Sequence, residues 1–289
     1  GIRERGRALG INGMWGNVGM AMVPFAVGLF NFLIGWRGGL VIVGTIGMLL
    51  GFAGLFAPFH VKKGSDQMET EPLDEKTARR LFLVFALALA FGGLLFRSFT
   101  LILPTFLEYR LGDISEQLRM WVSEHIIPIE GGTAFNTLTA NIVATFVYVV
   151  GIVGQYIGGH VADRYSLKHG YFFFFLIAMP FLFAIVFFKS WVLIPASGLF
   201  VLFLLGMQPI ENSLVAYLTP AKWRSIGFGL KFTLVFGAGA FGVKLVSLVE
   251  KSAGLEAVMQ LNLVYNLGIV LMAGILIIAS RKVIIRHNT

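Results

Sequence analysis

Eight runs of mainly apolar residues divide this chain, and they constrain its fold more than any other feature. They occupy residues 11–34, 38–59, 80–107, 138–160, 171–189, 191–218, 227–249 and 260–280. A helix of about 20 such residues is long enough to cross the hydrocarbon core of a bilayer. A backbone in hydrocarbon must also satisfy its own hydrogen bonds, and a helix does so. The sequence therefore predicts an all-α integral membrane protein with eight transmembrane helices.

The composition supports this prediction and excludes several classes of protein. Of the 289 residues, 57% are hydrophobic and 13% are charged, which is outside the usual range of soluble globular domains. The chain has no cysteine, and it shows no zinc-ligand spacing, phosphate-binding glycine loop or nucleophile elbow. We therefore expect a lipid bilayer around the chain and no catalytic residues, cofactor or metal site. The protein is not expected to be an enzyme.

The distribution of lysine and arginine indicates how the helices are oriented. If the N-terminus is cytoplasmic, most basic residues fall in the cytoplasmic segments, which are 1–10, 60–79, 161–170, 219–226 and 281–289. The segments on the other side hold five, namely Arg37, Arg110, Arg119, Lys189 and Lys251. Because cytoplasmic loops carry the excess of positive charge, we expect cytoplasmic termini and a bacterial inner membrane. This arrangement also accounts for the net charge of +8 without any binding to nucleic acid.

Two charges of opposite sign lie at the same depth in neighbouring spans. Glu211 and Lys231 stand ten positions before and after Ala221, the centre of the turn that joins two antiparallel spans. At 1.5 Å per residue, both lie about 10 Å inside the ends of their helices. We hypothesise that they form an ion pair and that Glu211 takes part in proton coupling. The alternative is that Lys231 extends to the membrane surface and Glu211 pairs elsewhere.

Arg97 is a further charged residue within a span. A guanidinium at this depth needs a partner or a water-filled cavity, because it remains charged. We hypothesise that Arg97 contacts the substrate, through an anionic group. The alternative is a structural ion pair with a residue on helices outside this sequence. Lys244, which lies nearer the end of its span, is expected to extend to the membrane surface.

Uncharged polar residues recur at helical spacing on two of the spans. Asn141 and Gln155 lie on one face of the span 138–160, and Gln208 and Asn212 lie beside Glu211. A polar stripe on an apolar helix faces protein or water rather than lipid. These four residues therefore either line a transport pathway or form hydrogen bonds between neighbouring helices.

Glycines also recur on the span 138–160, at Gly151, Gly154 and Gly158. Small residues at this spacing allow helices in membranes to approach one another closely. We therefore expect these glycines to have a structural role.

The short polar loop at 158–170, GGHVADRYSLKHG, contains the pattern Gly-x-x-x-Asp-Arg at Gly159, Asp163 and Arg164. This pattern, the start RGRALG, the GWR at 35–37 and the long charged loop at 60–79 resemble the major facilitator superfamily. The resemblance covers essentially the whole chain. It implies a partial major facilitator fold in which the eight spans are the family's fifth to twelfth helices, so the first four helices are expected to lie upstream.

On this resemblance the chain divides into three parts. Residues 1–59 hold the last two helices of the N-terminal bundle, and 60–79 form a cytoplasmic loop between bundles. Residues 80–289 form the six-helix C-terminal bundle, with an outer insertion at 108–137. The implied function is secondary active transport of a small solute of unknown identity by alternating access. A non-transporting membrane sensor or assembly factor on the same fold is the alternative.

The resemblance also implies a gating role for the loop. Asp163 is expected near the cytoplasmic start of the first span, around Arg7, where its carboxylate meets the positive end of a helix dipole. Such a contact can form and break during a transport cycle. The alternative is a solvated turn in which Arg164 and Lys168 only follow the charge rule for cytoplasmic loops.

The outer insertion has a pattern of its own. The stretch DISE at 113–116 reads as a capping box, with Asp113 at the N-cap and Glu116 three residues later. A short helix at the outer membrane interface, with Trp121 among the lipid headgroups, is the favoured interpretation. A lid over the outer mouth or a partner-binding element is the alternative.

Overall fold

The computed structural model describes residues 5–56, 74–129 and 132–281. In these ranges all regular secondary structure is helical, either α or 3-10, and there is no β-strand. The elements are α1 (Arg5–Leu55), α2 (Glu75–Arg110), α3 (Gly112–His125), α4 (Gly132–Arg164), α5 (Leu167–Phe187), η2 (Ser190–Val192), α6 (Leu193–Leu218), η3 (Ala221–Trp223) and α7 (Arg224–Ala279). The predicted all-α fold is confirmed.

Six helices in the described part of the chain, all except α3, are long and apolar enough to cross a membrane. The predicted count of eight spans is not confirmed, because two pairs of predicted spans each fall within one helix. Spans 11–34 and 38–59 fall within α1 as far as the described residues reach, and spans 227–249 and 260–280 fall within α7. Residues 57–59 of the second span lie outside the described residues.

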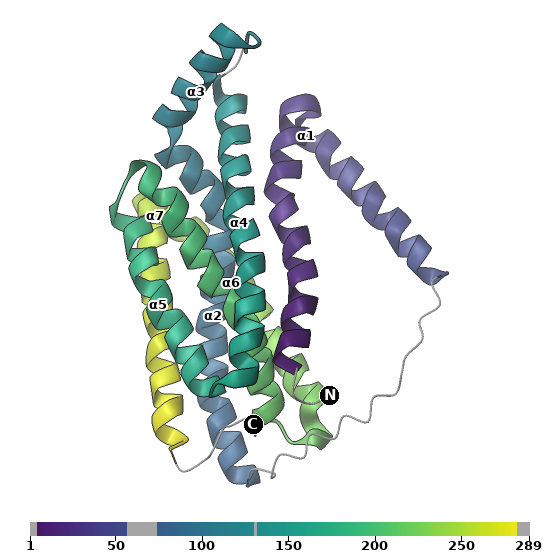
Figure 1. The fold of residues 1–289 in the computed structure, drawn as a ribbon, viewed down its shortest axis with the longest axis vertical. Coiled ribbons are helices and arrows are strands. Elements are labelled where there is room, and N and C mark those ends of the chain that lie inside the picture. Colours follow the sequence, from purple (N-terminus) through teal and green to yellow (C-terminus); the bar gives the residue numbers. More distant parts are fainter. Residues whose placement is uncertain (1–4, 57–73, 130–131, 282–289) are drawn as a thin grey trace.

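Both long helices are interrupted at a glycine. Gly35 in α1 has a φ of 75° and Gly254 in α7 has a φ of 83°, a left-handed conformation that glycine adopts without steric cost. Figure 1 shows that α1 and α7 turn back at these breaks, so that each consists of two helical segments. The 51 residues of α1 would otherwise extend about 75 Å, more than twice the thickness of a bilayer core.

Apart from the second segment of α1, which diverges from the rest, and α3, which continues in the direction of α2, the segments pack as a bundle in which neighbours along the chain run in opposite directions (Figure 1). Helix α4 packs against α1 on one side and α6 on the other, α2 packs against α7, and α5 packs against α6 and α7. The starts of α1, α2 and α5 share one end of the bundle with the end of α4, and we call this the N-terminal end. The opposite end, from which α3 projects, is the α3 end.

The predicted close approach at the glycines of α4 is confirmed. A methyl group on Gly158 would lie 1.6 Å from the carbonyl oxygen of Gly206 in α6, and one on Gly154 would lie 2.1 Å from that of Leu202. The backbones of α4 and α6 therefore touch at these points, where no side chain fits. Gly151 meets the Leu205 side chain in the same interface.

Helix α2 begins earlier than predicted. Its N-cap is Asp74, whose carboxylate accepts a hydrogen bond from the backbone N–H of Thr77 at 3.2 Å. Residues 75–79, which were assigned to the loop between bundles, are therefore helical, because this cap satisfies an otherwise unpaired N–H of the first turn. Residues 60–73 of the predicted loop lie outside the described residues.

A cluster around Arg110 holds three helices together at the α3 end. The guanidinium of Arg110, at the end of α2, forms an ion pair with Glu256 of α7 at 3.0 Å. It also donates a hydrogen bond to the carbonyl of Val186 near the end of α5. Glu256 lies two residues after the break at Gly254, so this pair fixes the start of the second segment of α7.

The predicted insertion at 108–137 is shorter than expected, because α2 extends to Arg110 and α4 starts at Gly132. Between them, α3 confirms the predicted short helix, but its cap was wrong. The N-cap residue is Leu111, and no side chain caps this end. Figure 1 shows that α3 projects beyond the ends of the other helices.

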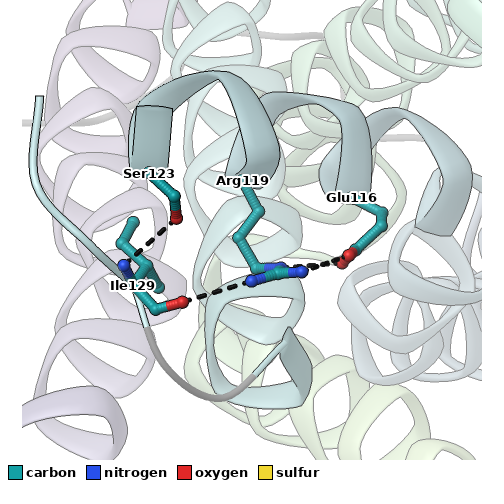
Figure 2. Close-up of polar contacts among 4 residues, drawn as sticks. All are labelled: Glu116, Arg119, Ser123 and Ile129. Atoms are coloured by element: carbon teal, nitrogen blue, oxygen red, sulfur yellow. Dashed lines mark hydrogen bonds and ion pairs between the residues drawn. The ribbon is translucent and has the colours of Figure 1, made fainter. Parts of the chain in front are cut away.

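Glu116 forms an ion pair within α3 and does not cap the start of this helix (Figure 2). It forms an ion pair with Arg119, whose Nε lies 2.9 Å from the Glu116 carboxylate. Arg119 also donates to the carbonyl of Ile129, and the N–H of Ile129 donates to Ser123 Oγ at 3.1 Å. These two hydrogen bonds hold the segment that follows α3 against the helix. We call α3 and this segment, residues 112–129, the α3 hairpin.

The α3 hairpin should loosen in acid. The hydrogen bond from Arg119 holds the pKa of Glu116 below its usual value of 4.5. A lowered pKa means that the ionised carboxylate stabilises the folded hairpin above that value, and that this stabilisation is lost as the pH falls through the lowered pKa. A spin label at Ile127→Cys should be immobile at pH 7 and become more mobile in acid. Arg119→Gln should give the mobile spectrum at both pH values, whereas the control Glu124→Gln should not.

Gly158→Ala should destabilise the protein, although alanine is the better helix former by about 0.5–1 kcal/mol. The added methyl group forces α4 away from α6, and overpacking of this kind costs about 1–3 kcal/mol. Thermal unfolding in detergent, followed by tryptophan fluorescence, should therefore show a lower Tm. The control is Gly198→Ala in the same interface, where a methyl group would meet Val150 at an ordinary 3.6 Å. Equal Tm values for the two variants would contradict the contact.

Candidate functional site

Three cavities meet at the middle of α2. The largest, of about 600 Å³, lies between α1, α2 and α4 and contains Arg97; we call it the arginine cavity. A second, of about 210 Å³, lies between α2, α6 and α7 and contains Glu211 and Lys231; we call it the ion-pair cavity. A third, of about 480 Å³, lies between α2 and α7. Phe96 lines all three cavities, and Arg97 lines the first and third.

Glu211 and Lys231 form the predicted ion pair. Lys231 Nζ lies 2.7 Å from Glu211 Oε1, and both side chains are buried. The ammonium also donates a hydrogen bond to Asn212 Oδ1. The alternative in which Lys231 extends to the membrane surface is therefore wrong. Two opposite charges at this depth offset each other's loss of hydration, and removal of one leaves the other buried and unpaired.

The position of this pair follows from the chain around it. The short turn that contains η3 makes α6 and α7 antiparallel neighbours, which brings the two residues level. Pro209 has no backbone N–H to donate within α6, so the helix lacks one hydrogen bond next to Glu211. The hydroxyl of Ser213 bonds back to the Pro209 carbonyl at 2.8 Å. The ion pair therefore sits beside a weakened turn of α6.

Two glutamines extend the polar region from α6 to α4. Gln155 Nε2 donates to Gln208 Oε1 at 2.6 Å, and Gln208 lines the ion-pair cavity. The Gln155 Oε1 atom is buried and has no hydrogen-bond partner among the described residues. Gly13 of α1 leaves space for it, since a methyl group there would lie 2.5 Å from this oxygen. Of the two expectations for Gln155, the hydrogen bond between helices is confirmed.

In the arginine cavity, a side chain of α4 satisfies a backbone carbonyl of α2 that lacks its partner within the helix. Pro104 has no N–H, so the carbonyl of Thr100 has no partner within the helix. The hydroxyl of Tyr148 in α4 donates to that carbonyl at 3.1 Å. Asn141 also lines the cavity, and its side-chain N–H donates to the carbonyl of Thr137 within α4. Tyr148 thus joins α4 to α2 at the point where α2 lacks a backbone bond.

Arg97 has an exposed side chain and forms no ion pair with any residue that the structure describes. A second charged residue, Glu108, lines the same cavity, and its carboxylate accepts a hydrogen bond from the Thr137 hydroxyl at 2.6 Å. The sequence analysis missed Glu108, because the predicted span ended at residue 107. It also missed Phe96, because one phenylalanine among 28 carries no signal of its own.

Asp163 lies where the sequence predicted. Its two carboxylate oxygens accept hydrogen bonds from the backbone N–H groups of Gly6 and Arg7, at 2.6 and 2.8 Å. These N–H groups belong to the first turn of α1 and have no partner within the helix. A methyl group on Gly159 would lie 2.7 Å from the Gly6 carbonyl oxygen, so this glycine allows the approach. Arg164, the next residue after Asp163, is exposed.

The alternative in which Lys168 lies solvated in the loop is wrong. It is buried, and its ammonium donates to the carbonyl and the hydroxyl of Ser280 at 2.9 and 3.0 Å. Ser280 caps the C-terminal end of α7, where unpaired carbonyls attract a positive charge. Lys168 therefore joins the start of α5 to the end of α7.

Comparison with known proteins gives one finding on the family. A family model described as Major Facilitator Superfamily matches residues 1–243. The match includes all three cavities and the loop around Asp163. No curated protein matches the chain.

Phe96→Ala should open a path between the arginine cavity and the ion-pair cavity, because the ring is a wall of both. The absence of cysteine allows a single thiol at Met207→Cys, in the ion-pair cavity, to report on access. A charged thiol reagent should modify this cysteine faster when Phe96 is alanine. Leu101→Ala, which enlarges the arginine cavity alone, is the control. Equal modification rates in the two variants would show that Phe96 does not separate the cavities.

Proposed function

Since the chain belongs to the major facilitator superfamily, a family of membrane transporters rather than enzymes, we propose that it acts in secondary active transport. In this proposal a small solute crosses the membrane by alternating access, in which the site opens to one side at a time. The two segments of α1 belong to one bundle, and the six proposed membrane-spanning segments of α2, α4, α5, α6 and α7 belong to the other. The termini are cytoplasmic, and the membrane is a bacterial inner membrane.

The observation that carries this proposal is the buried ion pair of Glu211 and Lys231 beside a cavity. A charge within membrane-spanning helices destabilises a protein unless it has a partner, and such residues mark pathways for ions and substrates. Protonation of Glu211 would release Lys231 and change the hydration of the cavity. This is the property that coupling of solute movement to a proton requires.

A second contact supports a change between a state that is open to one side of the membrane and a state that is open to the other. The carboxylate of Asp163 holds the start of α1 through two backbone hydrogen bonds. This contact joins the two proposed bundles at the N-terminal end and closes that side when it forms. It depends on a carboxylate and two N–H groups at a helix terminus, so it can break without disrupting a packed core. Gly159, Asp163, Arg164 and Arg7 form the proposed gating loop and its docking site.

The solute pathway in this proposal runs along the arginine cavity and the ion-pair cavity. Arg97 contacts an anionic group of the solute in the arginine cavity. Asn141 lines the same cavity, and Gln208, Asn212 and the ion pair line the other. Gln155 positions Gln208 by its hydrogen bond.

Uptake into proteoliposomes that contain the full-length protein tests the proposed function. A proton gradient should drive accumulation of at least one solute from a panel of amino acids, sugars and organic anions. Glu211→Gln should abolish the dependence of uptake on the proton gradient. Lack of gradient-driven flux for every solute class would contradict the proposal.

A double-mutant cycle tests the ion pair itself. Glu211→Gln and Lys231→Met should each lower activity severely, because an unpaired buried charge costs about 3–5 kcal/mol. The double variant should be less impaired than the sum of the single variants, with a coupling energy of about 0.5–3 kcal/mol. Lys244→Met, which removes an exposed charge from the same helix, is the control. Strictly additive losses would show that the pair has no role in transport.

A further inference from the structure

The arginine cavity contains two opposite charges on one face of α2. Arg97 and Glu108 both line it, and they lie eleven positions apart, which is about three helical turns and about 16 Å along the axis. This distance exceeds the screening length of about 8 Å in physiological salt. The two charges therefore do not neutralise each other through the water of the cavity. Neither residue forms an ion pair within the described part of the chain.

The uncharged polar groups of the cavity are largely committed to the protein. The Tyr148 hydroxyl donates to the Thr100 carbonyl, and the Thr100 hydroxyl donates to the Phe96 carbonyl at 2.7 Å. The Asn141 amide donates to the Thr137 carbonyl, and the Thr137 hydroxyl donates to Glu108. What the cavity offers to a ligand is therefore mainly the charge at each end.

The surface between the two charges is mainly apolar. Val23 and Val27 of α1 face the cavity from one side, and Leu101 and Pro104 of α2 form the wall between Arg97 and Glu108. The volume of about 600 Å³ lies in the range of small-molecule sites. A solute that fits this surface has an apolar middle.

We propose that this cavity binds a bipolar solute, with an anionic group on Arg97, a cationic group on Glu108 and an apolar body between them. The guanidinium offers a planar pair of N–H donors to a carboxylate, and the Glu108 carboxylate accepts from an ammonium group. Amino acids with well-separated charges and short peptides belong to this chemical class. The inference rests on the proposed transport function and deepens it by naming the class of substrate.

Binding of matched ligands to the full-length protein in nanodiscs, measured by calorimetry, tests this proposal. The ligands are ω-amino acids of three to eight carbons, each compared with the fatty acid and the alkylamine of the same carbon number. At the best chain length, the amino acid should bind about tenfold more tightly than either analogue, since one charge-assisted hydrogen bond contributes about 1.5–3 kcal/mol. Equal affinity for amino acid and fatty acid at every length would overturn the proposal, as would binding of none of them.

Two substitutions assign the ends of the ligand. Glu108→Gln should remove the advantage of the amino acid over the fatty acid, and Arg97→Gln should remove its advantage over the alkylamine. Arg97→Lys should keep part of the preference for a carboxylate. Binding by this variant would show that the protein still folds when Arg97 is replaced. Glu250→Gln, which changes an exposed carboxylate outside the cavity, should alter neither ratio. A Glu108→Gln variant that weakens acid and amino acid equally would show a structural role and overturn the assignment.

Failure of this inference is distinguishable from failure of the proposed function. If proteoliposomes accumulate another solute but the protein binds no ω-amino acid, the substrate class is wrong and transport stands. If no solute is accumulated, the transport proposal fails whatever the cavity binds.

Discussion

The direct contact of helix backbones along α4 determines where Gln155 and Asp163, two polar groups on this helix, find their partners. Gly154 and Gly158 let α6 touch one face of α4, and Gly159 lets the start of α1 touch the other. Because α4 is held between these two neighbours, Gln155 reaches Gln208 and Asp163 reaches the first turn of α1. A bulkier residue at any of these glycines would separate the partners of a hydrogen bond within about one helical turn.

The charged residues inside the bundle show a common principle. A charge within apolar helices is stable when a partner on another helix satisfies it. Lys231 meets Glu211, and Lys168 meets the end of α7. Arg97 is the contrasting case within the described residues, since it faces a cavity in place of a partner. The first two charges therefore stabilise the packing of the described helices, whereas Arg97 is held by no ion pair with a described residue.

Much of this arrangement follows from sequence periodicity and helix geometry. The depth of Glu211 and Lys231 could be counted from the turn between two antiparallel helices. Asp163 could be placed from the family resemblance, with the polarity of a helix terminus as the physical reason. Other contacts could not be predicted, because they depend on which helices are neighbours. The burial of Lys168 requires the end of α7 beside the start of α5, and nothing in the local sequence indicates it. The false cap at Asp113 had a different cause, since Glu116 has a stronger partner in Arg119 than a backbone N–H provides.

The break in α7 divides this helix into two segments that different ion pairs hold. The second segment is anchored at its start, where Glu256 binds Arg110 and Arg110 binds the end of α5. The first segment is held instead through Lys231, which pairs with Glu211 of α6, and Gly254 lies between the two anchors with a left-handed backbone. Any tilt of the first segment is therefore absorbed at a single residue. Gly254 is thus the point between the two ion pairs at which the helix could bend.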